Sequence, residues 1–387
     1  MSVAKKNPLV SNYEITVTLG GENVDMSAFE ENKKSLNEKL RLVRSERYAC
    51  QSVARQAVPK ERVSMCLRKV NGSNVEVHKH RKTDKAFYAG LLVCGSVWVC
   101  PVCAAKISER RKKEIQQAFE MHKGDGGKIA LLTLTFSHKK TDRLKDTIKK
   151  FGQATTKFMT GKSYQNIRDT LGLIGRIRVY EVTYGRNGFH PHVHIALFYT
   201  NDVDLEVIKK KMFILWEKAC IKFGLTASEK YGLDLQNGDE AEEYLSKHGT
   251  WSLEQELSKS HIKKAKNDSM TPFDFLRKYL EIEDQKYLKL FAEYVECFKG
   301  KRQIQWSQGL KKRFVLVEKT DEELAKEKIE EADILGMLNY DQWKIILKND
   351  LRSKFLDNVE KYGFDLAVKI TIKKESSWHE DSKTNEI

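Results

Sequence analysis

The chain has 387 residues and a formal net charge of +15, from 69 Lys and Arg against 54 Asp and Glu. This length allows two or three domains, and the excess of positive charge favours a polyanionic partner such as a nucleic acid. No apolar stretch approaches the roughly 20 residues of a membrane span, and the first residues lack the apolar region of a signal peptide. We therefore expect a cytoplasmic protein without a membrane partner.

The N-terminal third contains little regular pattern before one basic helix. Residues 1–44 read as a polar N-terminal extension, and residues 45–105 read as an irregular segment that holds most of the cysteines. A basic helix is predicted over residues 104–122 and should end before the turn sequence GDGG. Residues 45–122 are therefore predicted to form a cysteine-rich zinc-binding segment that includes this helix.

Four of the seven cysteines cluster in the sequence. Disulfides are rare in cytosolic proteins, so these cysteines are not expected to form a disulfide framework. The candidate ligands are Cys66, Cys94, Cys100 and Cys103. The last two form a CPVC pair, whose spacing suits two thiolates on zinc. Four protein ligands leave no open position, so such a zinc would be structural. His78 and His80 are alternatives to Cys66, and a buried set that binds nothing is the simpler alternative.

Residues 123–250 alternate between strand and helix patterns. The expected elements are strands at 128–140, 176–184, 190–197 and 232–236, and helices at 141–160, 204–223 and 239–248. The order strand, helix, two strands, helix, strand is typical of a ferredoxin-like α+β domain with an antiparallel sheet.

The composition changes after residue 250. Residues 258–268 are charged and predict an exposed loop. Thr271 and Pro272 then suit the N-cap and first position of a helix, which is predicted to run without a break to Gly300. We expect residues 251–365 to form a mainly helical C-terminal region and residues 366–387 to form a polar tail.

The segment GFHPHVHIALF, residues 188–198, contains three of the chain's ten histidines. Period-two spacing places His190, His192 and His194 on one face of a strand. A polar face with satisfied histidines is the simpler alternative, but clustered imidazoles favour a shared cation. In one register of the predicted hairpin Glu181 lies opposite His192 and adds a carboxylate ligand, whereas a one-residue shift turns it away. Mg or Mn would suit a site that also binds phosphate.

The segment EYLSK follows these strands. Tyr244 and Lys247 lie one helical turn apart, and Glu240 lies one turn before the tyrosine. Lys247 would stabilise a phenolate and Glu240 would accept the phenol proton, which would make Tyr244 a nucleophile. The alternative is an ordinary exposed helix surface.

Several ordered motifs between about Cys66 and Leu310 carry a resemblance to a known family. They are CGSVWVCPVC, LTLTFSH, YEVTYGRNGFHPHVH, EYLSKHG, MTPFDFL and KGKRQIQWSQGL. Together they resemble the rolling-circle replication initiators of small bacterial plasmids, in the superfamily of endonucleases with a His-hydrophobe-His motif.

This resemblance implies an enzyme that nicks single-stranded DNA. His192 and His194 match the metal-binding pair, with His190 beside them, and Tyr244 matches the nucleophile. Its product would be a 5′-phosphotyrosine and a free 3′-hydroxyl primer. The implied partners are plasmid origin DNA, single-stranded or cruciform, and then host helicase and polymerase.

Three other functions use part of the same pattern. A nickase for transposition or mobilisation would share the chemistry. A histidine-triad nucleotide hydrolase would explain HPHVH but would give the cysteines no role. A non-catalytic zinc-containing DNA-binding repressor would explain the charge and the cysteines but would leave the histidines without a role.

Overall fold

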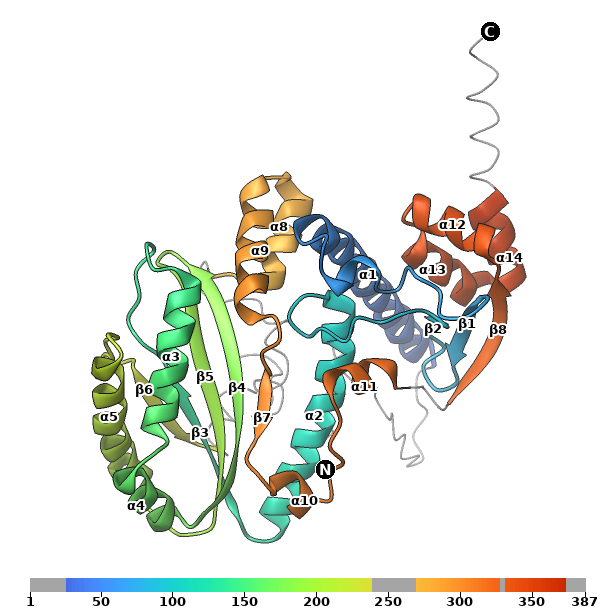
Figure 1. Ribbon diagram of the computed structural model, residues 1–387. Coiled ribbons are helices and arrows are strands. Elements are labelled where there is room, and N and C mark those ends of the chain that lie inside the picture. Colours follow the sequence, from blue (N-terminus) through green and yellow to red (C-terminus); the bar gives the residue numbers. More distant parts are fainter. Residues whose placement is uncertain (1–25, 239–268, 328–330, 374–387) are drawn as a thin grey trace. The chain divides into compact units, whose positions relative to one another are not determined.

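The computed structural model describes residues 26–238, 269–327 and 331–373 (Figure 1). The chain divides into two compact units. One unit is Val97–Leu324, and the other combines Met1–Ser96 with Ala325–Ile387. Helix α11 (Asp321–Lys326) contains the second boundary. Within the described residues, no helix has both the length and the apolar character that crossing a bilayer requires.

The larger unit is built on a five-stranded antiparallel sheet with the order β6-β3-β5-β4-β7. Its strands are β3 (Lys128–Leu134), β4 (Leu173–Gly185), β5 (Gly188–Tyr199), β6 (Leu233–Asn237) and β7 (Ile304–Trp306). The first four follow the predicted chain order, with β5 placed between β3 and β4. This arrangement is ferredoxin-like, so the predicted α+β fold class is confirmed.

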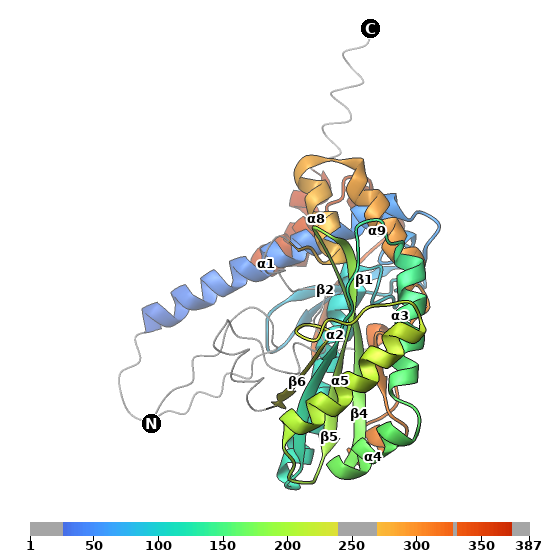
Figure 2. The same cartoon turned by 90° about the vertical axis from the view of Figure 1, so that its left-hand side faces the viewer.

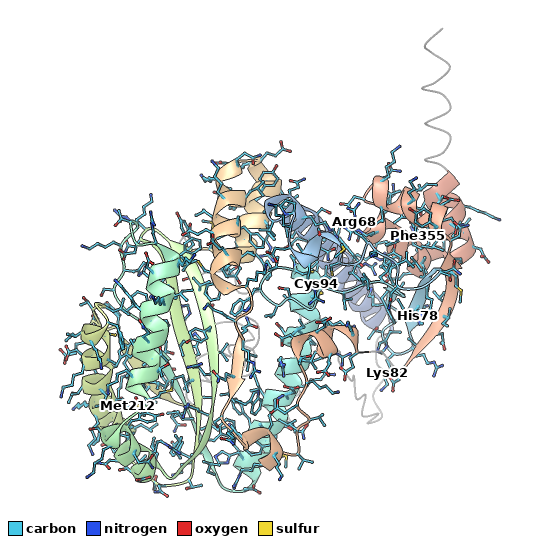
Figure 3. The ribbon with its side chains drawn as sticks, in the orientation of Figure 1. Arg68, His78, Lys82, Cys94, Met212 and Phe355 are labelled. Carbon is cyan, nitrogen blue, oxygen red and sulfur yellow. The ribbon has the colours of Figure 1, made fainter. Side chains whose placement is uncertain are left out.

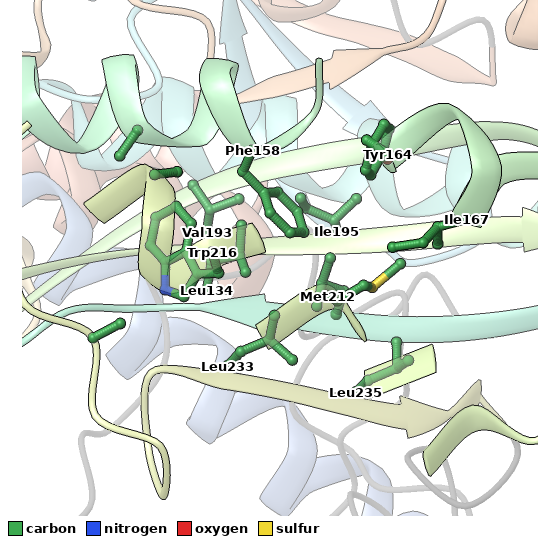
Figure 4. Close-up of a cluster of buried hydrophobic side chains, with 14 of the residues drawn as sticks. Leu134, Phe158, Tyr164, Ile167, Val193, Ile195, Met212, Trp216, Leu233 and Leu235 are labelled. Atoms are coloured by element: carbon green, nitrogen blue, oxygen red, sulfur yellow. The ribbon is translucent and has the colours of Figure 1, made fainter. Parts of the chain in front are cut away.

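Three helices cover one face of this sheet (Figures 1 and 2). They are α3 (Leu144–Phe158), α4 (Lys162–Leu171) and α5 (Leu205–Lys222). Figure 4 shows the core between these helices and the sheet, where Trp216 and Phe158 pack on Val193 and Ile195 of β5. The Trp216 indole also donates to the carbonyl of Thr135 at 2.9 Å, which ties α5 to the end of β3. Helix α4 lies beyond the predicted helix, which ended at residue 160, and was not predicted.

The opposite face is covered by α2 (Pro101–Gly124), which confirms the predicted basic helix, and by α10 (Leu310–Arg313). Ile115 and Phe119 of α2 pack on Ala196 and Phe198 of β5. The side chains of β5 alternate between faces, so the residues on this face continue as His194, His192 and His190. On this face of β5, the side chains are therefore apolar where α2 packs on the strand and are histidines beyond that contact.

The predicted single helix from Thr271 to Gly300 is wrong, because two helices occupy that range. Helix α8 (Pro272–Ile282) begins at the predicted Thr271 N-cap and ends before Glu283, whose φ of 51° is left-handed. The Asp284 carboxylate then accepts a hydrogen bond from the Lys286 amide at 2.9 Å and starts α9 (Gln285–Phe298). A left-handed residue followed by an N-cap ends one helix and starts another.

The second unit contains a three-stranded antiparallel sheet with the order β2-β1-β8. Its strands are β1 (Val75–His80), β2 (Ala86–Ala89) and β8 (Ala332–Leu338). Its helical elements are α1 (Met26–Ala57), η1 (Arg62–Ser64), α12 (Tyr340–Lys348), α13 (Arg352–Tyr362), α14 (Phe364–Val368) and the π-helix η2 (Lys369–Lys373). Trp343 and Phe355 pack on Val75 and Val77 in its core; Figure 3 labels Phe355.

This unit corrects two expectations. Residues 45–105 are not wholly irregular, because they include the end of α1 and strands β1 and β2. The C-terminal region is helical as predicted but also contains β8, which pairs with β1. A strand whose partner lies at the other end of the chain has no local turn signal, so sequence patterns do not reveal it. The predicted domain boundaries stay predictions.

We expect Trp216→Ala to destabilise the protein by about 3–5 kcal/mol, because it leaves a large cavity in the core. Trp216 is 0% exposed. Ile214→Ala on the same helix is the matched control, since Ile214 is 50% exposed and should change the stability by about 0.5 kcal/mol or less. Urea unfolding followed by circular dichroism measures both. Equal effects of the two substitutions would contradict this assignment of the core.

Candidate active site

The β4–β5 hairpin positions the histidine face. Its register pairs Glu181 with His192, Val179 with His194 and Thr183 with His190. The predicted register is therefore confirmed, and the Glu181 side chain lies on the histidine face. The hairpin turns tightly at Gly188, whose φ of 86° is readily available only to glycine.

The Glu181 carboxylate and two imidazoles converge on one point. Glu181 Oε2 lies 3.0 Å from His192 Nε2 and 3.2 Å from His194 Nε2. The three ligand atoms lie within 4.8 Å of one another. Glu181 is 2% exposed and His194 is 7% exposed, whereas His192 is partly exposed. Three protein ligands leave coordination positions for a substrate oxygen or water.

The hydrogen bond of His192 supports a cation at this point. Its Nδ1 lies 3.2 Å from the carbonyl oxygen of His190. A carbonyl only accepts, so Nδ1 carries the proton, and Nε2 of the neutral ring presents a lone pair. That lone pair would face a carboxylate oxygen at 3.0 Å, which is repulsive unless a cation or a proton lies between them. The residues present therefore fit a divalent cation.

His190 points elsewhere on the same face. Its Nε2 hydrogen-bonds with Thr135 Oγ1, and its ring stacks on His138 with 4.5 Å between the ring centroids. Burial lowers the pKa of His190 to about 3, together with the repulsion that a protonated His192 or His138 would exert on a charged His190 ring. The ring is thus neutral at ordinary pH. It lies next to the three converging ligands but is not one of them, and its predicted role as a ligand stays a prediction.

Sequence reasoning missed three neighbours of the histidines, all from the motif LTLTFSH. Thr133 Oγ1 lies 3.0 Å from His194 Nδ1, Thr135 contacts His190, and His138 stacks on it. Burial lowers the pKa of His138. The alternation of threonine in this strand could have indicated that both hydroxyls share one face, but only the pairing of β3 with β5 shows that they meet the histidines.

The predicted zinc ligands occur as two buried pairs. In the smaller unit, Cys66 Sγ accepts a hydrogen bond from the Cys94 amide at 3.4 Å. In the larger unit, Cys100 caps α2, and its Sγ accepts from the Cys103 amide at 3.5 Å. The four cysteines form a set of donors that could hold a metal ion.

The two alternative zinc ligands have other partners in the second sheet. His78 Nε2 lies 2.7 Å from Glu76 Oε2, and its ring stacks on Phe87. His80 Nδ1 accepts from the Lys82 amide at 3.1 Å. Figure 3 shows His78 well away from Cys94. Among the described residues, neither histidine belongs to a group of donors suited to a metal ion.

The predicted nucleophile and its helpers lie outside the described residues. Tyr244, Glu240 and Lys247 all fall in the segment 239–268. The chain enters that segment from β6, which pairs with β3 and so belongs to the sheet that carries the histidines. The roles of these three residues stay predictions.

The sequence matches known replication proteins. The profile of the replication protein family matches residues 92–354. The chain is 27% identical over 290 residues to the protein rep of Streptomyces lividans, covering 57% of this chain and 63% of that protein. It is 29% identical over 128 residues to the protein rep of Lentilactobacillus hilgardii, covering 31% and 39%.

A third match is the neomycin resistance protein of Streptomyces cyanogenus, 34% identical over 130 residues, covering 27% of this chain and 30% of that protein. The chain thus spans less than two thirds of the length of each of these relatives. No solved structure matches.

The antiparallel sheet carries His192 and His194, the pair that the resemblance to plasmid replication initiators matched, beside Glu181. The chain belongs to the replication protein family, whose profile covers most of it.

We expect Glu181→Gln to weaken Mn²⁺ binding at least about tenfold, because a neutral amide replaces the one buried carboxylate among the ligands. The side chain keeps its size, so the fold should survive. Isothermal titration calorimetry of the full chain measures the affinity. Glu206→Gln, at an exposed glutamate of α5, is the control and should bind Mn²⁺ as the unaltered chain does. Unchanged binding in Glu181→Gln would show that the carboxylate is not a ligand.

Proposed function

We propose that this chain initiates rolling-circle replication of a plasmid by nicking one DNA strand at the origin. The observation that carries the proposal is the convergence of Glu181 Oε2 with the Nε2 atoms of His192 and His194, in a chain of the replication protein family. A buried carboxylate beside two imidazoles is suited to hold a divalent ion next to a phosphodiester.

The chain's own residues supply the covalent step. Mg or Mn held by Glu181, His192 and His194 would polarise the scissile phosphate. The Tyr244 phenolate oxygen forms a bond to phosphorus as the bond from phosphorus to the 3′-oxygen breaks. Glu240 accepts the phenol proton, Lys247 stabilises the phenolate, and the leaving 3′-oxygen takes a proton from solvent. The products are a 5′-phosphotyrosine and a 3′-hydroxyl that can prime a polymerase.

One ester replaces another in this step, so the phosphotyrosine keeps the bond energy for later strand transfer. Ending a round requires a second nucleophile. Water activated by Glu240 suits that role, since the same carboxylate that accepted the phenol proton can accept a proton from water.

The expected partner is origin DNA, single-stranded or cruciform. The net charge of +15 suits a polyanion, and phosphate contacts by Lys and Arg make such binding salt-dependent. The free 3′-hydroxyl would prime a host polymerase, and a host helicase would unwind the duplex ahead of it, so the expected location of the protein is the cytoplasm. Membership in the replication protein family favours replication over transposition or mobilisation, and over a histidine-triad hydrolase or a repressor.

We also propose that Cys66, Cys94, Cys100 and Cys103 bind one structural zinc. Both buried pairs receive an amide hydrogen bond at sulfur, and a set of four thiolates leaves no position for a substrate. Its role would be to stabilise the fold, since the free energy of zinc binding contributes directly to folding.

Metal analysis tests this zinc site. We expect about one zinc per chain in the unaltered protein and a loss of zinc, with lower stability, in Cys100→Ser and Cys103→Ser. Cys220→Ser is the control, because Cys220 is also buried but lies in the core beside α3. Zinc should persist in that variant. Absence of zinc from the unaltered protein would contradict the proposal.

Tyr244→Phe tests the nucleophile. The change removes one oxygen and almost no volume, so DNA binding should survive. Nicking of single-stranded origin DNA with Mn²⁺ and the covalent adduct should both disappear, because a phenyl ring cannot attack phosphorus. Denaturing gels measure the adduct, and peptide mapping of the trapped adduct identifies the residue.

Tyr231→Phe is the matched control, since Tyr231 is an exposed tyrosine near the same segment, and it should nick normally. An adduct on Tyr231 or Tyr164 would move the nucleophile to that residue. If the unaltered chain forms no adduct at all with origin DNA, the proposed nicking activity is wrong.

A further inference from the structure

The two converging histidines have different hydrogen-bond partners behind the ligand face. His192 Nδ1 faces the backbone carbonyl of His190 at 3.2 Å. His194 Nδ1 faces the side-chain hydroxyl of Thr133 at 3.0 Å. Thr133 lies directly opposite His194 in the β3–β5 register, so the pairing of two central strands holds this contact in place.

The two partners restrict the rings to different extents. A carbonyl oxygen only accepts, which fixes His192 with its proton on Nδ1. A threonine hydroxyl both donates and accepts, so His194 is compatible with either tautomer. With its proton on Nε2, His194 donates to Glu181 Oε2 at 3.2 Å, and Thr133 donates to Nδ1. With its proton on Nδ1, His194 donates to Thr133 and presents the Nε2 lone pair to a cation.

We infer that Thr133 is a positioning residue that lets His194 change tautomer when the site takes up its divalent ion. Without the ion, a proton on Nε2 separates the ring nitrogen from the buried carboxylate. When the ion binds, that proton is lost to solvent and one is taken up at Nδ1, so the ring stays neutral. The hydroxyl rotates from donor to acceptor, and the ring keeps its orientation. This inference rests on the proposed function, because it assumes that the Glu-His-His group binds an ion.

The surroundings of Thr133 suit a fixed hydroxyl. Strand β3 lies between β5 and β6, and Thr133 pairs with His194 on one side and with Asp234 on the other. A β-branched side chain in a central strand has few χ1 states, so the Oγ1 atom stays in reach of the ring. Valine has the same shape as threonine but can neither donate nor accept.

Two substitutions in the full chain test the inference. Thr133→Val keeps the shape and removes the hydroxyl, and we expect Mn²⁺ affinity in calorimetry without DNA to fall by roughly 10–100-fold, as is typical for loss of a partner behind a ligand. Thr133→Ser restores the hydroxyl and should bind within about threefold of the unaltered chain. Thr135→Val is the matched control, because Thr135 lies on the same strand but contacts His190, and it should keep its affinity.

Nuclear magnetic resonance of protein with ¹⁵N-labelled histidine reports the tautomer directly. The His194 signals, assigned by their loss in His194→Gln, should indicate a proton on Nε2 without Mg²⁺ and on Nδ1 with Mg²⁺. The His192 signals should indicate Nδ1 protonation in both states. Circular dichroism should show that Thr133→Val is folded.

The outcomes separate this inference from the proposed function. If the unaltered chain nicks DNA but Thr133→Val binds Mn²⁺ equally well, or His194 keeps one tautomer, only the inference is wrong. An equal loss of affinity in Thr133→Ser or Thr135→Val would overturn it as well. If the affinities and tautomers change as expected but the unaltered chain does not nick DNA, the inference stands and the proposed function is wrong.

Discussion

A buried carboxylate facing two imidazole nitrogens is the constraint on which the site depends. Glu181 is 2% exposed, and a carboxylate so deep in a protein needs a positive partner, because burial without one is costly. Its Oε2 atom meets Nε2 of both His192 and His194. Since the carbonyl behind His192 holds that ring's proton on the far nitrogen, the charge of the carboxylate is best balanced by a cation between the three groups.

The packing of the sheet explains why the ligands are fixed while one of them stays accessible to a substrate. One face is covered by α3, α4 and α5. On the other face, the apolar packing of α2 reaches Ala196 of β5, and the next side chains on that face are the histidines. A rigid core on both sides of the strand therefore fixes the ligands, while His192 stays partly exposed. Sites on such central strands are positioned more accurately than sites on loops.

The second sheet belongs to the smaller unit and has a core of its own. Strand β8 completes a sheet with β1 from the N-terminal part of the chain, so the segments before and after the larger unit form one core. The match to the replication protein family begins at residue 92 and ends at residue 354. It thus includes the entire larger unit and part of the smaller one.

The sequence by itself determined the features that repeat at short range. Alternation in β5 predicted the histidine face, the order of strand and helix patterns predicted the ferredoxin-like sheet, and Thr271 predicted the start of α8. The individual strand and helix patterns and the helix start depend on neighbours within a few residues, which a local pattern records. The tertiary structure decided what depends on strand pairing: the β1–β8 pair, the contact between Thr133 and His194, and which histidines face Glu181. Partners far apart in the chain meet only when the sheet forms, so no local pattern specifies them.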